Sequence, residues 1–124
     1  MIRVTEVAYT GYPVTDMTRA RAFYEGVLKL APAGTWEKDG KAWIEYEIGA
    51  SALAITNMAP DWKPATADGP VAALEVADFN AAVAALRAAR VKFTVEPMDS
   101  GSCHQAVVSD PDGNCLAIHH RDQK

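Results

Sequence analysis

Apolar side chains recur at helical spacing in two segments of the chain. The pattern predicts amphipathic helices near Asp16–Lys29 and Asp78–Arg90, each with an apolar stripe along one face. Asp16 or Thr15 precedes the first stripe and Asp78 precedes the second. These residue types are favoured as N-caps because their side-chain oxygens accept hydrogen bonds from the free N–H groups of the first turn.

Short runs rich in apolar and β-branched residues flank each helix, with turn residues between them. The runs VTEVAYTGYPV and PVAALEV precede the helices, and three more runs follow each helix. The predicted strands after the helices are residues 31–37, 42–48 and 52–56 in the first half, and 91–96, 104–109 and 115–120 in the second.

The two halves resemble each other in sequence. The segment from Val14 matches the segment from Val76 at an offset of 62, and the word Leu53-Ala54-Ile55 matches Leu116-Ala117-Ile118 at an offset of 63. Two matches at nearly one offset indicate an internal duplication. The predicted modules are residues 1–57 and 69–124, joined by a proline-containing linker at 58–68.

This order of elements predicts an α+β fold made of two βαβββ modules. In each module the first strand joins the three later strands in one small sheet, and the helix covers one face. The opposite faces are then free to curve around a shared cavity. Within a single domain, the modules therefore form a curved mixed sheet around that cavity.

Composition narrows the class of partner. The chain has 124 residues, 49% of them hydrophobic and 23% charged, which is typical of a globular protein. A net charge of −4 argues against nucleic acid or an anionic membrane as partner. No apolar run approaches the ~20 residues of a membrane helix, and no targeting segment is visible at the N-terminus. Two cysteines suit buried thiols in a reducing compartment, so we expect a cytoplasmic protein.

Two longer motifs carry a family resemblance. They are YPVTDMTRARAFYEGVLKL in the first half and VVSDPDGNCLAIHH in the second. Within DPDGN, Pro111 and Asp112 suit the central positions of a tight turn, and Gly113 tolerates the φ that follows. With the duplication, these motifs resemble the vicinal oxygen chelate superfamily, which includes glyoxalase I, extradiol dioxygenases, fosfomycin-resistance enzymes and bleomycin-binding proteins.

The resemblance implies one divalent ion, held by His, Gln or Glu from the first and last strand of each module. The duplication places those positions at Tyr9, Ala54, Val71 and Ala117. Alanine and valine have no lone pair to offer, and a neutral tyrosine is a poor ligand. We therefore expect no metal centre and no cofactor, which favours the metal-free bleomycin-binding branch of the family.

Strand alternation nominates the side chains that would line the cavity. In the strand at 42–48, Ile44 and Tyr46 should lie under the helix, with Trp43 and Glu45 on the other face. A hairpin turning near Pro111 would place His104 opposite His119. The candidates for ligand binding are Tyr9, Trp43, Glu45, Glu75, His104 and His119. Trp43 could equally serve packing, and Glu45, Glu75 and His119 could equally be solvated surface groups.

Three functions remain open. The first is a metal-free protein that binds a small organic molecule with apolar and cationic or hydrogen-bonding parts. The second is a metal-independent enzyme, a lyase or isomerase, that uses a carboxylate–imidazole pair for acid–base chemistry. The third is a metal-dependent lyase or dioxygenase with displaced ligands such as His104, Cys115 and His119. Exposed sheet edges and apolar helix faces further predict a homodimer.

Overall fold

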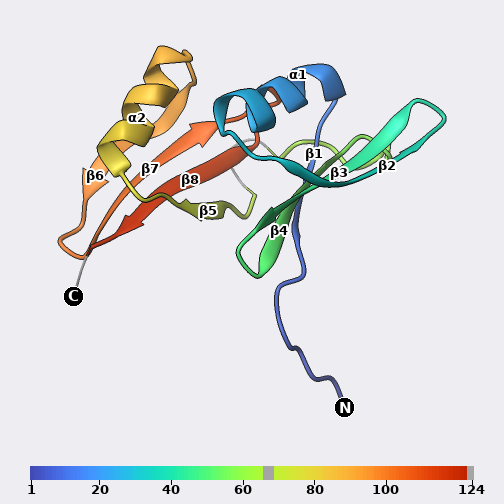
Figure 1. Ribbon diagram of the computed structural model, residues 1–124, viewed down its shortest axis with the longest axis horizontal. Coiled ribbons are helices and arrows are strands. Elements are labelled where there is room, and N and C mark those ends of the chain that lie inside the picture. The colour runs from blue at the N-terminus through green and yellow to red at the C-terminus, as the bar shows by residue number, and fades with distance from the viewer. Residues whose placement is uncertain (66–68, 123–124) are drawn as a thin grey trace. The chain divides into compact units, whose positions relative to one another are not determined.

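The computed structural model describes residues 1–65 and 69–122 of the chain. The chain divides into two compact units, Met1–Pro64 and Ala65–Lys124, and each holds one helical segment and one sheet (Figure 1). None of the helices in the described part combines the length and the apolar character needed to cross a membrane.

The first unit contains four strands and one two-part helix. The elements are β1 (Thr10–Pro13), α1 (Met17–Arg21), a π-helix η1 (Ala22–Val27), β2 (Pro32–Lys38), β3 (Lys41–Ile48) and β4 (Ser51–Thr56). The strand order is β1-β4-β3-β2. The β1–β4 pair is parallel and the other two pairs are antiparallel, so the sheet is mixed.

The second unit repeats this arrangement. Its elements are β5 (Ala72–Glu75), α2 (Phe79–Ala88), β6 (Phe93–Asp99), β7 (Cys103–Ser109) and β8 (Cys115–Arg121). The strand order is β5-β8-β7-β6, again with only the first pair parallel. The two-module βαβββ fold predicted from the duplication is therefore confirmed.

The repeated words have matching roles in the two units. Asp16 and Asp78 are the N-caps of α1 and α2, and each carboxylate accepts a 3.0 Å hydrogen bond from the backbone N–H three residues later. Ala54 and Ala117 lie at the centres of β4 and β8, the strands that pair in parallel with β1 and β5. The duplicated segments thus form equivalent structures in the two units: a helix N-cap in one case and a central strand in the other.

The core of the first unit lies between the sheet and its helix. Ile44 and Tyr46 of β3 are fully buried, as predicted from alternation, together with Leu53 and Ile55 of β4. The Tyr46 ring stacks on Tyr24 of η1, with ring centroids 6.1 Å apart. The apolar face of the sheet is therefore the helix side, and its other face carries the remaining side chains of these strands.

The first helix departs from the predicted continuous α-helix. After α1 the chain continues as the π-helix η1, in which Leu28 donates to the carbonyl of Phe23 five residues earlier. This wider turn buries two consecutive aromatic side chains, Phe23 and Tyr24. It also places Glu25 where its carboxylate accepts hydrogen bonds from Tyr46 at 2.9 Å and Arg21 at 2.6 Å. Helical periodicity alone could not predict this change of pitch.

We expect Tyr46→Phe to lower the free energy of unfolding by about 1 kcal/mol near neutral pH, because one buried hydrogen bond is lost. Burial, and then the hydrogen bond to Glu25, raises the pKa of the Tyr46 hydroxyl well above its ordinary value. The folded protein then keeps a proton that the unfolded chain releases from about pH 10 upward, so stability falls there as pH rises.

Tyr46→Phe lacks this component, so its stability deficit should shrink between about pH 8 and about pH 11. Urea denaturation of both proteins at each pH measures the deficit. A deficit that stays constant over this range would contradict the prediction.

Candidate functional site

The face of the first sheet away from its helix carries the polar and aromatic side chains of β3. Trp43 and Glu45 are half-buried there, and the Trp43 indole Nε1–H donates to a Glu45 carboxylate oxygen at 2.8 Å. The Tyr9 ring meets Trp43 edge-on, with centroids 5.2 Å apart and planes at 88°. Three sequence-predicted candidates therefore lie together on this face, and Glu45 fixes the orientation of the indole.

Small residues beneath the aromatic rings make room for them. Gly11 pairs with Ala54 at the centre of the sheet. A Cβ added at Gly11 would lie 3.0 Å from the Trp62 ring and 3.4 Å from the Tyr9 ring. Both rings thus lie over Gly11, and the small side chains of Gly11 and Ala54 allow this close approach.

Trp36 lies on the same face of the sheet. It pairs with Trp43 across β2 and β3, and directly paired residues project to the same side. Its ring folds back over Gly34, where an added Cβ would lie 2.6 Å from the ring. All three tryptophans of the chain therefore gather on this surface, which we call the aromatic face (Tyr9, Trp36, Trp43 and Trp62).

The aromatic face is substantially exposed. Relative exposure is 47% for Tyr9, 54% for Trp36 and 42% for Trp62. Exposed aromatic surface of this kind, next to a carboxylate, is suited to stacking on a flat ligand and to attracting a cation.

Sequence reasoning missed two members of the aromatic face. Trp36 could have been found from its place opposite Trp43 in the predicted hairpin. Trp62 lies in the linker, which has no periodicity. Two hydrogen bonds hold this part of the chain in place. The Asn57 side-chain oxygen accepts from the Ala42 N–H at 2.8 Å, and the Trp62 N–H donates to the Ala59 carbonyl at 3.1 Å.

The four positions implied for a metal do not fit one. Tyr9 and Val71 lie just before β1 and β5 and are each 47% exposed, whereas Ala54 and Ala117 are buried. In the parallel pairs with β1 and β5, these alanines lie opposite Gly11 and Ala73, which offer no donor side chain either. The side chains present at these places therefore cannot form the superfamily's usual ligand set.

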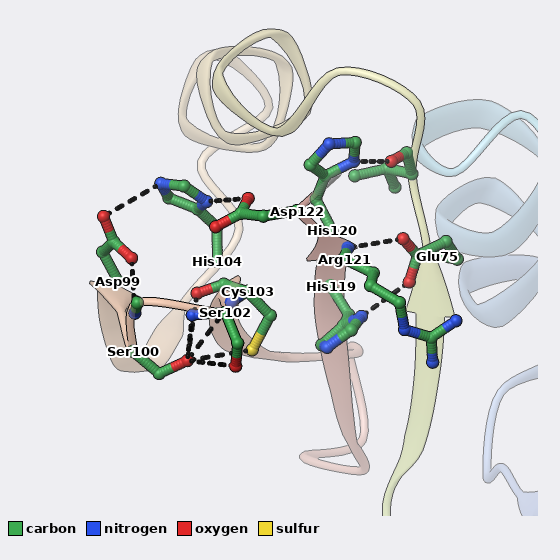
Figure 2. A network of polar contacts seen from close by, with 12 residues as sticks. Glu75, Asp99, Ser100, Ser102, Cys103, His104, His119, His120, Arg121 and Asp122 are labelled. Atoms are coloured by element: carbon green, nitrogen blue, oxygen red, sulfur yellow. Dashed lines mark hydrogen bonds and ion pairs between the residues drawn. The ribbon is translucent and has the colours of Figure 1, made fainter. Parts of the chain in front are cut away.

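The second unit brings two predicted candidates into direct contact. His119 of β8 and Glu75 of β5 are partners in the parallel register, and His119 Nδ1 lies 2.6 Å from one Glu75 oxygen (Figure 2). The other Glu75 oxygen accepts the backbone N–H of Arg121 at 2.6 Å. This N–H, and to a smaller degree His119, holds the pKa of Glu75 below its ordinary value. The carboxylate thus fixes the imidazole and directs its Nε2 away from the pair.

The expected proximity of His104 and His119 is wrong. His104 pairs with His120, whereas His119 pairs with Gln105, so the two imidazoles lie on opposite faces of the sheet. The reason is the length of the turn. Asp110 and Asn114 close it by backbone and side-chain hydrogen bonds, and the first strand pair beyond it is Ser109 with Cys115. A register shift of one residue moves every side chain to the other face.

The same register rules out the displaced metal set of His104, Cys115 and His119. His104 faces the helix side, where its ring lies 5.5 Å from Phe79. Cys115 and His119 share the other face but are four residues apart along β8, or roughly 13 Å. These three side chains cannot bind one ion.

Comparisons with known proteins agree with this architecture. A family model described as the Glyoxalase/Bleomycin resistance protein/Dioxygenase superfamily matches residues 6–118. A search of curated proteins found no match.

Among solved structures, TnmS3, an antibiotic binding protein from Streptomyces sp. CB03234, is 21% identical, with 98% of this chain and 100% of that chain covered and a TM-score of 0.80. A glyoxalase/bleomycin resistance protein from the same Streptomyces strain is 23% identical over 91% and 98%, with a TM-score of 0.73. The trypanothione-dependent glyoxalase I of Leishmania major is 22% identical over 94% and 87%, with a TM-score of 0.76. At these identities the likeness concerns the fold.

We expect Glu75→Gln to change how the free energy of unfolding depends on pH in the acid range. Because the folded pKa of Glu75 is lowered from 4.5, the ionised carboxylate stabilises the fold above that pH, and this contribution is lost as pH falls through the folded pKa. Glu75→Gln should therefore be less stable than wild type near neutral pH and approach it in acid. His119→Gln should remove only part of the effect, since the Arg121 N–H contributes more. Urea denaturation across acid pH measures this, and parallel profiles of wild type and Glu75→Gln would contradict it.

Proposed function

Since the chain belongs to the glyoxalase/bleomycin resistance protein/dioxygenase superfamily, we propose that it binds a small organic molecule without using a metal at the family's ligand positions. The aromatic face is the observation that carries the proposal. It gathers every tryptophan of the chain on one side of one sheet, and three of its four side chains are about half exposed. Leaving this much aromatic surface in water is unfavourable unless a partner covers it.

The contacts on this face support a particular class of ligand. Tyr9 and Trp43 meet edge to face, so they form two walls at a right angle and not one flat stack. Glu45 lies next to Trp43 on the same face of β3, and one of its oxygens accepts a hydrogen bond from the indole N–H. Aromatic faces attract cations, and a neighbouring carboxylate strengthens that attraction. The proposed ligand is therefore a planar aromatic molecule that carries a positive charge.

TnmS3 is an antibiotic binding protein, which supports a binding role for this fold. We extend only the general property, the binding of a small molecule, to this chain. As expected from the sequence, we also propose that the protein is a cytoplasmic homodimer.

A second candidate function rests on the Glu75–His119 pair. A carboxylate at 2.6 Å from Nδ1 favours the tautomer in which Nε2 is a proton acceptor. Such a pair can act as a general base toward a group that reaches Nε2. We propose this metal-independent acid–base chemistry as the alternative to binding alone.

Trp43→Leu should weaken binding of a cationic planar aromatic ligand by about tenfold, because one wall of the corner is lost. Glu45→Gln should weaken binding of the cationic ligand but leave its neutral isostere almost unchanged. Quenching of tryptophan fluorescence during titration with acriflavine-type cations, their neutral isosteres and aliphatic ammonium ions measures this, since all three tryptophans lie on this face.

Thr35→Val is the matched control because Thr35 precedes Trp36 on β2 but projects from the other face. It should bind as the wild type does. Equal affinity of wild type and Trp43→Leu for every quenching ligand would contradict the proposal, as would the absence of quenching and thermal shift across the whole panel.

For the acid–base alternative, His119→Asn should abolish any conversion of a bound ligand while leaving its affinity within about twofold. His120→Asn is the control, because the His120 Nδ1 bonds to the Val76 carbonyl on the other face. Nuclear magnetic resonance of the ligand over time distinguishes conversion from binding. Conversion that survives in His119→Asn would exclude this residue as the base.

A further inference from the structure

Cys103 lies on the same face of the second sheet as the Glu75–His119 pair. In the β7–β8 register, Cys103 is directly opposite Arg121, and Gln105 is directly opposite His119. Residues two apart on a strand project to the same side, so these four side chains leave the sheet on the face away from the helix. Cys103 and His119 are therefore diagonal neighbours, with Cα atoms roughly 7–8 Å apart, a separation within reach of a side chain as long as histidine.

The imidazole of His119 is oriented toward this thiol. Glu75 of β5 lies 2.6 Å from Nδ1 and so occupies one side of the ring. Figure 2 shows Nε2 on the other side of the ring, directed toward the sulfur of Cys103. When Nδ1–H is donated to the carboxylate, Nε2 carries the lone pair that can accept a thiol proton. A thiol, an imidazole and a carboxylate thus follow one another in the order that nucleophilic catalysis requires.

Two neighbouring side chains suit an attack by this thiol on a carbonyl group. The Ser100 Oγ lies 3.3 Å from the Cys103 Sγ, which holds the half-buried thiol at the start of β7. Gln105 lies two residues further along β7 and directly opposite His119. Its side-chain amide carries N–H donors, which stabilise the negative charge that develops on a carbonyl oxygen during such an attack.

We propose that Cys103, His119 and Glu75 act as nucleophile, base and orienting carboxylate in the hydrolysis of small carboxylic esters, an inference that rests on the acid–base role of His119 proposed above. His119 Nε2 takes the thiol proton as Sγ bonds to the carbonyl carbon. The alcohol leaves with that proton, and a thioester remains. Water then attacks the thioester and gives a proton to Nε2. The S–C bond breaks, the acid departs and the proton returns to sulfur.

The test uses the full chain and 4-nitrophenyl acetate, whose hydrolysis is followed by the absorbance of 4-nitrophenolate. The wild type should turn the ester over, and mass spectrometry of rapidly quenched samples should find an acetyl group on Cys103. Cys103→Ala should lose both the adduct and the turnover. His119→Gln should slow formation of the adduct by about 100-fold, because the base is lost. Glu75→Gln should slow it less, because the imidazole remains but is no longer held by a carboxylate.

Cys115→Ser and His120→Asn are the controls, because Cys115 lies four residues before His119 on β8 and His120 projects from the other face. Both should react as the wild type does. In Cys115→Ser, methyl methanethiosulfonate should block turnover and dithiothreitol should restore it, a result that needs no substitution at Cys103.

Equal acetylation of Cys103 and Cys115 in the wild type, or an unchanged rate at Cys103 in His119→Gln, would overturn the proposal. Turnover that persists in Cys103→Ala but is lost in His119→Gln would also overturn it, while the acid–base function of His119 would stand without this nucleophile. Binding at the aromatic face is measured separately with the Trp43 and Glu45 variants.

Discussion

The parallel pairing of the first and last strand in each unit is the constraint on which the rest of the structure depends. It is closed by equivalent hydrogen bonds, from the Val14 N–H to Thr56 at 2.9 Å and from the Val76 N–H to His119 at 2.8 Å. Because the last strand is central, its residues face the helix on one side and the open surface on the other. This pairing therefore determines which side chains project from each face of the sheet. Where side chains from other segments lie across the centre of the sheet, the residues beneath them must be small.

Much of the fold could be predicted from the sequence because local signals agreed with each other. The N-caps Asp16 and Asp78, the apolar stripes after them and the duplicated Leu-Ala-Ile words pointed to the same two modules, and the observed sheets have that topology. The grouping of Ile44 with Tyr46 under the helix followed from alternation alone, since an antiparallel strand between two neighbours leaves no other way to bury its apolar set.

The site was harder to predict because it depends on geometry that alternation does not encode. The partner of His104 depended on the number of residues in the turn, and an error of one changed the face on which it lies. Trp62 is placed by hydrogen bonds of a linker without a period, and Glu75 meets His119 through a parallel register that no local motif specifies. In each case a turn, or a contact between separate segments, decides the position of the side chain, and alternation along one strand does not.

On the sheet faces away from the helices, other side chains lie near the positions where the family's metal ligands are expected. In the first unit, Gly11 and Ala54 leave space at the centre of the sheet, and Tyr9 and Trp62 extend over it. In the second unit, Ala73 and Ala117 occupy the equivalent pair, and the polar pair of Glu75 and His119 follows two residues later on the same strands. One duplicated scaffold thus presents an aromatic surface next to the Glu45 carboxylate in one unit and an oriented imidazole in the other. A binding role draws on the first surface and proton transfer on the second, so these two functions are separable by substitution within one chain.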